Sequence, residues 1–307
     1  SQFFGNPGGN EGKIGCGECA HGGHLPLFCQ QEGSGHRQPG SHGVRMHHQR
    51  GSEQQHGSHA HYPCSHFHPA DISVDSSGAP LYKRGYRSGQ PLAPLNEVLA
   101  AGILMLSGWN ASSALYDPMC GSGTIPVEAG LIACRVPPGR FRKKYGFMKW
   151  KDYDRDLFRR VREQCDSVIR KSPVEIRGSD VSEQAVRQSL INVRNAGMAD
   201  SVKIEVADFR NLEPLAGNGF LFLNPPYGER LKPEDLNQLY GMIGTTLKHS
   251  YAGFRAWVIT PGRELLTNIG LKTKSKQTLF NGSIECILAE FELYSGTRKH
   301  RDGPKST

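Results

Sequence analysis

The sequence predicts an α/β fold with a doubly wound sheet that ends in an antiparallel strand pair. Three observations support this prediction. From residue 71 onward, short apolar runs alternate with helical patterns, and this alternation is typical of parallel sheets covered by helices. A Gly-rich turn joins the first strong strand to a helix. Two strand patterns near the end are separated only by Asn281-Gly282, which favours a tight hairpin.

Helices are predicted where apolar side chains recur every three or four residues. The stretch 95–106 fits this spacing, and the charged stretch 152–171 is strongly amphipathic. Ser182 is a typical N-cap for the helix that follows it. The predicted helices are 95–106, 124–134, 152–171, 182–196 and 234–249.

Strands are predicted where short runs are rich in apolar and β-branched residues. Residues 220–224 (FLFLN) form a run typical of a strand buried on both faces, and residues 256–260 (AWVIT) resemble it. The predicted strands are 114–117, 174–180, 202–208, 220–224, 256–260, and the closing pair 275–280 and 284–294.

A change of composition near residue 70 divides the chain. Residues 1–70 contain 11 of the 13 His residues and few aliphatic side chains. Such a segment buries too little apolar area to offset chain entropy by itself. We therefore predict an irregular, low-complexity His/Gly-rich segment over 1–70, with no domain assigned, and one folded domain over 71–307.

Two hypotheses about this N-terminal segment stay open. Cys16 and Cys19 form one C-x-x-C pair, and His21, His24 and Cys29 follow it. Two such pairs at finger spacing would be typical of zinc, and from a single pair we expect no metal site. The segment also ends abruptly where ordinary patterning begins, which fits a shifted reading frame and can be tested by resequencing the coding region.

The formal net charge of +8 lies wholly in residues 71–307, because residues 1–70 contain four Lys/Arg and four Asp/Glu. A basic domain favours polyanionic partners such as nucleic acids. No stretch approaches the ~18 apolar residues of a membrane span, and no secretory pattern opens the sequence. The scattered later cysteines are typical of reduced thiols. We expect a cytoplasmic protein without a membrane partner.

A Gly-rich turn follows the first predicted strand of the folded domain. Gly121 and Gly123 let the backbone approach a ligand without a Cβ clash, and the helix that begins here attracts anions at its N-terminus. Val127 stands where a dinucleotide motif has its third glycine, and the turn lacks the Gly-Lys-Ser/Thr of a P-loop. The turn therefore favours an adenosine ligand without a pyrophosphate. Its candidate ligand-binding residues are Asp117, Pro118, Cys120, Gly121, Gly123 and Thr124.

Two acidic residues end the next two strands, at the edge of the sheet where ligands bind. Asp180, with Val181 beside it, is placed to accept hydrogen bonds from two ribose hydroxyls. The alternative is that Asp180 caps the next helix, since it lies 57 residues after Gly123. Asp208 is placed to accept from an adenine amino group, and Phe209 to pack on the ring.

The most specific motif is Asn224-Pro225-Pro226-Tyr227-Gly228, directly after a buried strand. Two consecutive prolines make a rigid turn without amide donors, so the carbonyls of Asn224 and Pro225 are free to accept. A base amino group that donates to both would present its nitrogen to a methyl donor, and Tyr227 would stack on the base. We predict Asn224, Pro225, Pro226 and Tyr227 as the catalytic residues, with Asn224 also beside the cofactor. A proline turn with a packing tyrosine is the alternative.

These motifs resemble the catalytic domain of class I S-adenosylmethionine-dependent methyltransferases, which implies a Rossmann-like sheet. More narrowly, residues 71–307 are similar to ribosomal large-subunit RNA guanine-N2 methyltransferases and their THUMP-containing relatives, over about three-quarters of the chain. The stretches that carry the resemblance are ISVDSSGAPLYKRGYR (72–87), APLNEVLAAGIL (93–104), DPMCGSGT (117–124), FRKKYGFMKW (141–150), GSD (178–180), NPPYGERL (224–231) and NGSIEC (281–286).

The resemblance implies an enzyme that transfers a methyl group from S-adenosylmethionine to the exocyclic amino group of a nucleic-acid base, foremost N2 of guanine in 23S ribosomal RNA. It implies that Asp117, Gly121 and Gly123 cradle the methionine part of the cofactor. It further implies that Asp180 holds the ribose and Asp208 the adenine.

The resemblance also leaves alternatives open. The motifs fit an N6-adenine DNA methyltransferase or a tRNA guanine-N2 methyltransferase as well. The segment near Pro94–Asn96 would close over the cofactor, but the family's RNA-binding THUMP domain is not recognisable in residues 1–70. A non-catalytic RNA-binding module and a His-rich metal-binding protein are the alternatives from other classes.

Basic residues in two stretches are candidates for contact with RNA. The insertion 140–150 mixes cations with aromatic residues, as grooves for single-stranded RNA do, and a solvated basic loop is the alternative. The predicted RNA-contacting residues are Lys83, Arg84, Arg87, Arg142, Lys143 and Lys144.

Overall fold

The computed structural model describes residues 45–46, 72–89, 95–214, 217–226 and 233–296. The chain divides into two units, Ser1–Glu32 and Gly33–Thr307, and all described residues belong to the second. Strand β1 (Arg45–Met46) pairs antiparallel with β2 (Ile72–Ser73). The zinc hypothesis for Cys16 and its neighbours lies outside the described residues.

A seven-stranded sheet forms the centre of the described fold, in the order β5-β4-β3-β6-β7-β9-β8. The five neighbouring strands β5, β4, β3, β6 and β7 run parallel to one another, and β9 runs antiparallel to both β7 and β8. The strand order reverses at β3, and loops that leave such a point in opposite directions open a crevice between them. The strands are β3 (Leu115–Asp117), β4 (Ile176–Asp180), β5 (Val202–Val206), β6 (Phe220–Leu223), β7 (Arg255–Thr260), β8 (Ser275–Asn281) and β9 (Ile284–Glu292).

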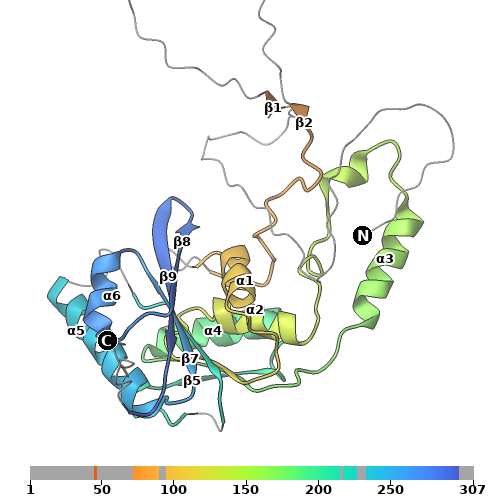
Figure 1. The fold of residues 1–307 in the computed structure, drawn as a ribbon. Coiled ribbons are helices and arrows are strands. Elements are labelled where there is room, and N and C mark those ends of the chain that lie inside the picture. The colour runs from red at the N-terminus through yellow and green to blue at the C-terminus, as the bar shows by residue number, and fades with distance from the viewer. Residues whose placement is uncertain (1–44, 47–71, 90–94, 215–216, 227–232, 297–307) are drawn as a thin grey trace, which may run out of the picture. The chain divides into compact units, whose positions relative to one another are not determined.

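Helices cover both faces of this sheet (Figure 1). Helices α1, α2 and α4 lie on one face, and α5 and α6 lie on the other. Each face has its own hydrophobic core, one centred on Leu115 and Val127 and the other on Leu221 and Ile243. The helices are α1 (Glu97–Leu106), α2 (Thr124–Ala133), α3 (Arg155–Ser167), α4 (Glu183–Asn195), α5 (Pro233–Ser250) and α6 (Arg263–Ile269), with short 3-10 turns η1 (Gly146–Lys149) and η2 (Phe209–Asn211).

The doubly wound sheet and its closing antiparallel pair confirm the predicted fold class. Ser182 caps α4 by accepting from Ala185 N, as predicted. Gly282, with φ of +68°, makes the turn between β8 and β9. The sequence analysis missed α6, which follows a Pro-Gly pair and has only 7 residues, too few for a helical period to stand out.

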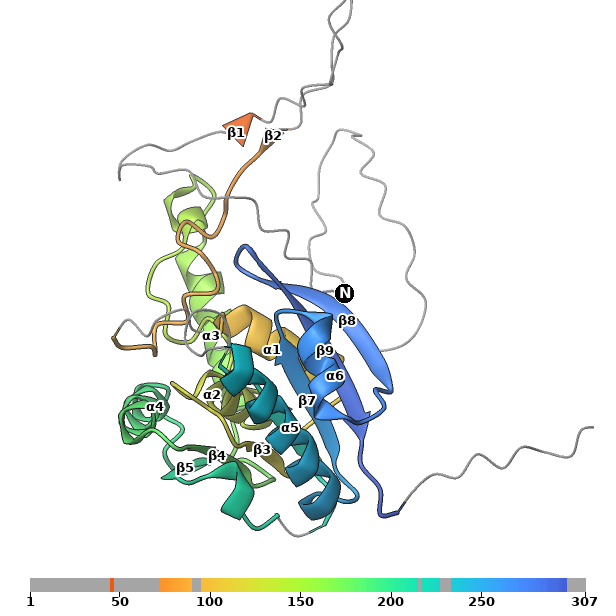
Figure 2. The ribbon, with the colours of Figure 1, turned by 90° about the vertical axis from the view of Figure 1, so that its left-hand side faces the viewer.

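Helix α3 differs from the other helices because none of its residues is buried. It lies outside the two helix layers in both views (Figures 1 and 2). Its Phe158 belongs to an aromatic cluster with Tyr145, Phe147 and Tyr153, whose ring centroids lie 5.2–6.1 Å apart. Residues 140–169, which we call the insertion lobe, thus have an aromatic cluster of their own. Backbone hydrogen bonds from Gly146 and Phe147 join the lobe to Ser77 and Ser76.

Candidate functional site

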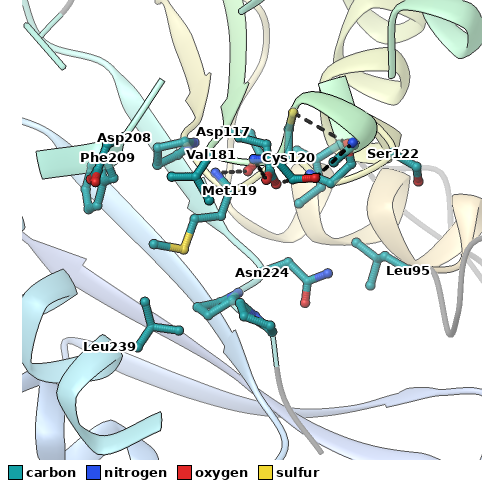
Figure 3. Close-up of a pocket in the computed structure, with 18 of the residues that line it drawn as sticks. Leu95, Asp117, Met119, Cys120, Ser122, Val181, Asp208, Phe209, Asn224 and Leu239 are labelled. Atoms are coloured by element: carbon teal, nitrogen blue, oxygen red, sulfur yellow. Dashed lines mark hydrogen bonds between the residues drawn. The ribbon is translucent and has the colours of Figure 1, made fainter. Parts of the chain in front are cut away.

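A cavity of about 1210 Å³ opens at the carboxyl ends of the parallel strands (Figure 3). This volume exceeds the usual range for a small-molecule site, so the cavity has room for two ligands side by side. The residues after β3, β4 and β6 line it. The predicted residues that line it are Asp117, Pro118, Cys120, Gly121, Thr124, Asp180, Val181, Asp208, Phe209, Asn224, Pro225 and Pro226.

The Gly-rich turn between β3 and α2 has the geometry that its glycines allow. Gly121 and Gly123 have φ of +53° and +78°, in the left-handed region that favours glycine. A Cβ on Gly121 would meet no atom within 4 Å, whereas one on Gly123 would collide with Ser189 Oγ on α4. Gly121 therefore keeps the cavity side of the turn open, and Gly123 lets the turn pack tightly on a helix.

Asp180 ties the end of β4 to the Gly-rich turn. Its Oδ2 accepts from Gly121 N at 3.0 Å, and its Oδ1 accepts from Ser182 N at 2.9 Å. The alternative from the sequence, that Asp180 caps the next helix, does not hold, because Ser182 is the N-cap of α4 and Asp180 bonds the backbone N–H of that cap residue. Each carboxylate oxygen can still accept a second hydrogen bond, so both local bonds leave acceptor capacity toward the cavity.

Asp117 ends β3 and is 1% exposed. Its Oδ1 accepts a long hydrogen bond from Met119 N, at 3.3 Å. Burial raises the pKa of Asp117 well above its usual value, and the nearby charge of Asp180 adds to this effect. Burial likewise raises the pKa of the Cys120 thiol. Asp117 is therefore a carboxyl group poised to take up a cationic partner.

The residues after β5 differ in part from their predicted environment. Asp208 lines the cavity, but its carboxylate accepts from Arg210 Nε at 3.0 Å, and this bond holds the pKa of Asp208 below its usual value. Phe209 is only 2% exposed and stacks on Tyr251, with ring centroids 5.4 Å apart. Little of the Phe209 ring is thus free to pack on a ligand.

Asn224 follows β6 and faces the Gly-rich turn across the cavity, with Leu95 and Leu239 on opposite sides of it (Figure 3). Its Oδ1 is buried and has no hydrogen-bond partner among the described residues. Pro225 is buried and Pro226 half-buried. Tyr227 lies outside the described residues. A buried, unsatisfied amide oxygen is costly in a folded protein, so Asn224 Oδ1 is available to a donor that enters the cavity.

The basic residues divide into two groups. Arg84 and Arg87 form ion pairs with the buried carboxylates of Glu128 and Glu97, at 3.3 and 3.2 Å. Arg142 donates to the carbonyl oxygens of residues 77, 79 and 80 and lies over the Tyr145 ring. These three guanidinium groups therefore serve the packing of the domain.

The remaining predicted RNA contacts, Lys83, Lys143 and Lys144, are exposed. Trp150, close by in the sequence, is 44% exposed. A charged and aromatic surface suited to a polyanion thus remains on the insertion lobe and next to Arg84.

The sequence analysis missed the part of the cavity wall that α5 supplies. Asp235, Gln238, Leu239 and Met242 line the cavity and lie at positions i, i+3, i+4 and i+7, which is one face of a helix. That spacing was visible in the sequence, but only the position of α5 over the cavity gives it meaning. Leu95 just before α1, Ser122 in the turn and Gln188 on α4 also line the cavity.

Neither a metal-binding cluster nor a membrane-spanning helix is found among the described residues. Within the described ranges, no three His, Cys, Asp or Glu side chains are grouped so as to hold a metal ion. No helix in the part of the chain that the structure describes has the length and apolar character needed to cross a membrane.

Solved structures share this fold. The chain is similar to SMU.472, a protein assigned as a methyltransferase and solved with SAH, with a TM-score of 0.68 and 33% identity over 75% of this chain and 60% of that one. It is also similar to a Listeria monocytogenes protein assigned as an N6-adenine-specific DNA methylase, with a TM-score of 0.66 and 30% identity over 74% and 58% of the two chains. The fold and the site thus define a domain of the methyltransferase class.

Within that class, the chain belongs to the family described as RMKL-like, methyltransferase domain, whose model matches residues 84–290. Among curated proteins it is 36% identical over 239 residues to ribosomal RNA large subunit methyltransferase K/L of Shewanella sp. (strain W3-18-1), covering 76% of this chain. It is 37% identical over 242 residues to the protein of the same name from Shewanella amazonensis, covering 77% of this chain. The chain spans 34% of the length of each of these relatives.

Proposed function

We propose that residues 71–307 bind S-adenosylmethionine and transfer its methyl group to the exocyclic amino group of a nucleic-acid base, foremost N2 of guanine in large-subunit ribosomal RNA. The observation that carries the proposal is the buried Oδ1 of Asn224, which faces the cavity without a partner among the described residues. An amino group is the donor that this oxygen lacks.

The chemistry of the cavity fits the cofactor. S-adenosylmethionine supplies an electrophilic methyl group on a positively charged sulfur, together with an ammonium, a carboxylate and a ribose. Asp117 offers a buried carboxyl to the ammonium, and the N-terminus of α2 at Thr124 offers backbone N–H groups to the carboxylate. Asp180 retains acceptor capacity for ribose hydroxyls, and Gly121 leaves open space above the turn.

The residues after β6 would hold the base. The oxygens of Asn224 and Pro225 would accept from the target amino group and stabilise the positive charge that grows on its nitrogen, and Tyr227 would stack on the base. Catalysis would be mostly positioning, with the amine proton lost to solvent after the nitrogen–carbon bond forms and the carbon–sulfur bond breaks. The base must leave any helix to reach Asn224.

The choice of ribosomal RNA rests on the names of the curated relatives, which are ribosomal RNA large subunit methyltransferases. A cytoplasmic location follows from that substrate. The second candidate is N6 of adenine in DNA, which the assignment of the Listeria monocytogenes relative favours. A tRNA substrate is the third, because the same residues would serve it.

The test is methyl transfer to ribosomal RNA, tRNA and plasmid DNA side by side, by the full chain and by Asn224→Ala. We expect product on ribosomal RNA and a loss of about 100-fold in kcat for Asn224→Ala, as for removal of one stabilising group at a reaction centre. Affinity for S-adenosylmethionine should stay within twofold. Asn218→Ala, an exposed change just before β6, is the control and should match the wild type. Product on DNA alone would overturn the substrate, and a large loss of cofactor affinity would overturn the role of Asn224.

RNA binding is proposed for Lys83, Lys143 and Lys144. Each phosphate contact adds close to one unit to the slope of log affinity against log salt. Lys143→Glu/Lys144→Glu should therefore weaken binding to a single-stranded RNA and lower that slope by about one to two units. Binding of SAH by the same variant is the control and should not change. An unaltered salt slope would remove these lysines from the interface.

A further inference from the structure

A strap of residues 84–88, which precedes α1, is bonded to helices α2 and α4, and both helices supply residues to the cavity wall. Arg84 Nη2 pairs with Glu128 Oε2 on α2 at 3.3 Å, and Tyr86 OH donates to Glu128 Oε1 at 3.0 Å. Ser88 N donates to Asn192 Oδ1 on α4 at 3.0 Å. The strap is thus anchored at several points. Ser88 Oγ accepts from Gln188 Nε2 at 3.1 Å, and Gln188 lines the cavity, but one side chain of the strap bonds two residues of the cavity wall at once.

That side chain is Arg87. Its Nη2 donates both to Leu95 O at 2.9 Å and to Thr124 Oγ1 at 3.0 Å, and its Nε pairs with Glu97 Oε1 at 3.2 Å. Leu95 and Thr124 line the cavity and come from different parts of the chain, since Leu95 lies just before α1 and Thr124 begins α2. One guanidinium nitrogen therefore holds two parts of the wall at a fixed separation.

We propose that Arg87 is a positioning residue for the cofactor cavity, which fixes Leu95 and Thr124 relative to each other so that the N-terminus of α2 keeps its place under the bound cofactor. It acts through these two residues and does not line the cavity itself. This role replaces the contact with RNA phosphate that the sequence predicts for Arg87. The proposal rests on the proposed cofactor but is independent of the nucleic acid methylated.

The planar fork of arginine is what the site requires. A guanidinium can pair with Glu97 through Nε while Nη2 bonds the wall, and its donors are held in one plane. A lysine at the same position keeps the charge next to Glu97, but its single ammonium cannot reproduce this fork. Because Glu97 is 6% exposed, retaining a positive charge beside it avoids leaving a buried carboxylate unpaired.

The strap supplies its own matched control. Arg84 and Glu128 form a pair of similar burial, with side chains 11% and 2% exposed, against 14% and 8% for Arg87 and Glu97. Glu128 lies one turn further along α2 and does not line the cavity. Arg84→Lys therefore perturbs an equivalent ion pair in the same strap without touching the wall.

The experiment compares Arg87→Lys with Arg84→Lys in the full chain, by calorimetric titration with SAH and by thermal unfolding without ligand. We expect Arg87→Lys to raise the Kd of SAH about tenfold, which is about 1.4 kcal/mol, and Arg84→Lys to change it less than twofold. The unfolding temperature should fall by similar amounts in both. A Kd within twofold of wild type for Arg87→Lys, or an equal rise for both variants, would overturn the proposal.

A second set of variants covers failure of Arg87→Lys to fold. Thr124→Val removes the hydroxyl that accepts from Arg87 and leaves the Arg87–Glu97 pair intact, so it should weaken SAH binding with little change in unfolding temperature. Where Arg87→Lys folds, the double variant Arg87→Lys/Thr124→Val should have a Kd for SAH close to that of the single variant that binds SAH less tightly. Both changes break the same link, so their effects should not add. Fully additive losses, or unchanged binding by Thr124→Val, would count against the link. Absence of SAH binding by the wild-type chain would instead reject the proposed cofactor.

Discussion

Asp117 is the residue of the cavity wall that is most costly to keep charged. It is 1% exposed and has one long hydrogen bond from Met119 N. A buried carboxylate with so little compensation binds its proton more tightly than in water, in agreement with its raised pKa. The energetic cost is acceptable in a binding site, because a cationic group of a ligand would remove it.

We predict that Asp117→Asn stabilises the ligand-free protein at neutral pH by about 1–2 kcal/mol. Because the pKa is raised on folding, the folded state holds a proton that the unfolded state has released. Stability therefore falls as pH rises from the usual pKa of the carboxyl toward its raised folded value. Asp117→Asn should flatten this fall, which begins near the usual carboxyl pKa of about 4, as measured by urea unfolding at each pH.

The same substitution should weaken SAH binding, since the ammonium loses its carboxyl partner. Calorimetry in buffers of different ionisation enthalpy should show proton release on binding to the wild type at pH values below the raised pKa of Asp117, and less release for Asp117→Asn. A variant that is less stable than wild type across the whole pH range would show that the Asp117 carboxylate is satisfied in a way its contacts do not reveal.

The positions of the motif residues could be predicted from the sequence. Asp117, Gly121, Asp180 and Asn224 line one cavity as predicted, because the ends of neighbouring parallel strands must meet at one edge of the sheet. Arg87 could not be placed from the sequence. Whether a cation faces a phosphate or a buried Glu97 depends on contacts between segments that no local pattern encodes.

At the scale of elements, the two glycines of the Gly-rich turn are required for different reasons. Gly121 and Gly123 share a left-handed backbone, but their surroundings differ. Open space lies beside Gly121, while α4 packs so closely on Gly123 that Ser189 Oγ occupies the place of a Cβ. One glycine therefore serves the ligand and the other serves the packing of α2 against α4.

We predict that Gly123→Ala lowers the free energy of unfolding by about 2–4 kcal/mol, from left-handed strain plus overpacking against Ser189. Gly121→Ala should cost only about 1–2 kcal/mol, from the backbone strain alone, yet it should weaken SAH binding because its methyl group enters the cavity. Urea unfolding and calorimetry measure the two effects.

Ser189→Ala should recover about 1 kcal/mol in the Gly123→Ala background, since it removes the colliding Oγ. Equal destabilisation by the two glycine variants, with no recovery from Ser189→Ala, would mean that α4 adapts and that packing does not explain Gly123.

Element boundaries were predictable to within a few residues where periodicity was strong. Helix α4 and the β8–β9 hairpin fall where Ser182 and Gly282 indicate. Helix α3 is shorter than its amphipathic pattern suggests, and that pattern does not mark a buried face, because none of its residues is buried. The helical spacing of apolar residues shows only that a helix could have an apolar face. Whether that face is buried depends on the elements that pack against it.

At the scale of the whole described molecule, the sheet core and the insertion lobe differ in how they are held. Both faces of the sheet bury continuous apolar clusters. The lobe has no buried residue in α3, and its contacts are the rings of Tyr145, Phe147, Tyr153 and Phe158 together with hydrogen bonds to residues 76–80. Regions with few buried contacts open at lower free energy than the global unfolding, so the lobe should open without the sheet.

We predict that Phe158→Ala uncouples the lobe from the rest of the domain. Phe158 contacts three other rings and lies under Arg162, 6.0 Å from ring centroid to guanidinium carbon. Its loss should speed amide hydrogen exchange at least about tenfold in α3 and η1, which corresponds to a loss of about 1.4 kcal/mol of local stability. Exchange in β6 and β7, and the Kd of SAH, should not change.

Val161→Ala is the matched control, since Val161 lies on the same helix, is 45% exposed and carries no aromatic ring. It should leave exchange in the lobe near the wild-type rate. If Phe158→Ala accelerated exchange equally in the lobe and in the central strands, the lobe would be part of the global folding unit. The exposed Lys143 and Lys144 would then lie on a surface that does not open separately from the sheet. Opening of the lobe could therefore not reposition these lysines for contact with a nucleic acid.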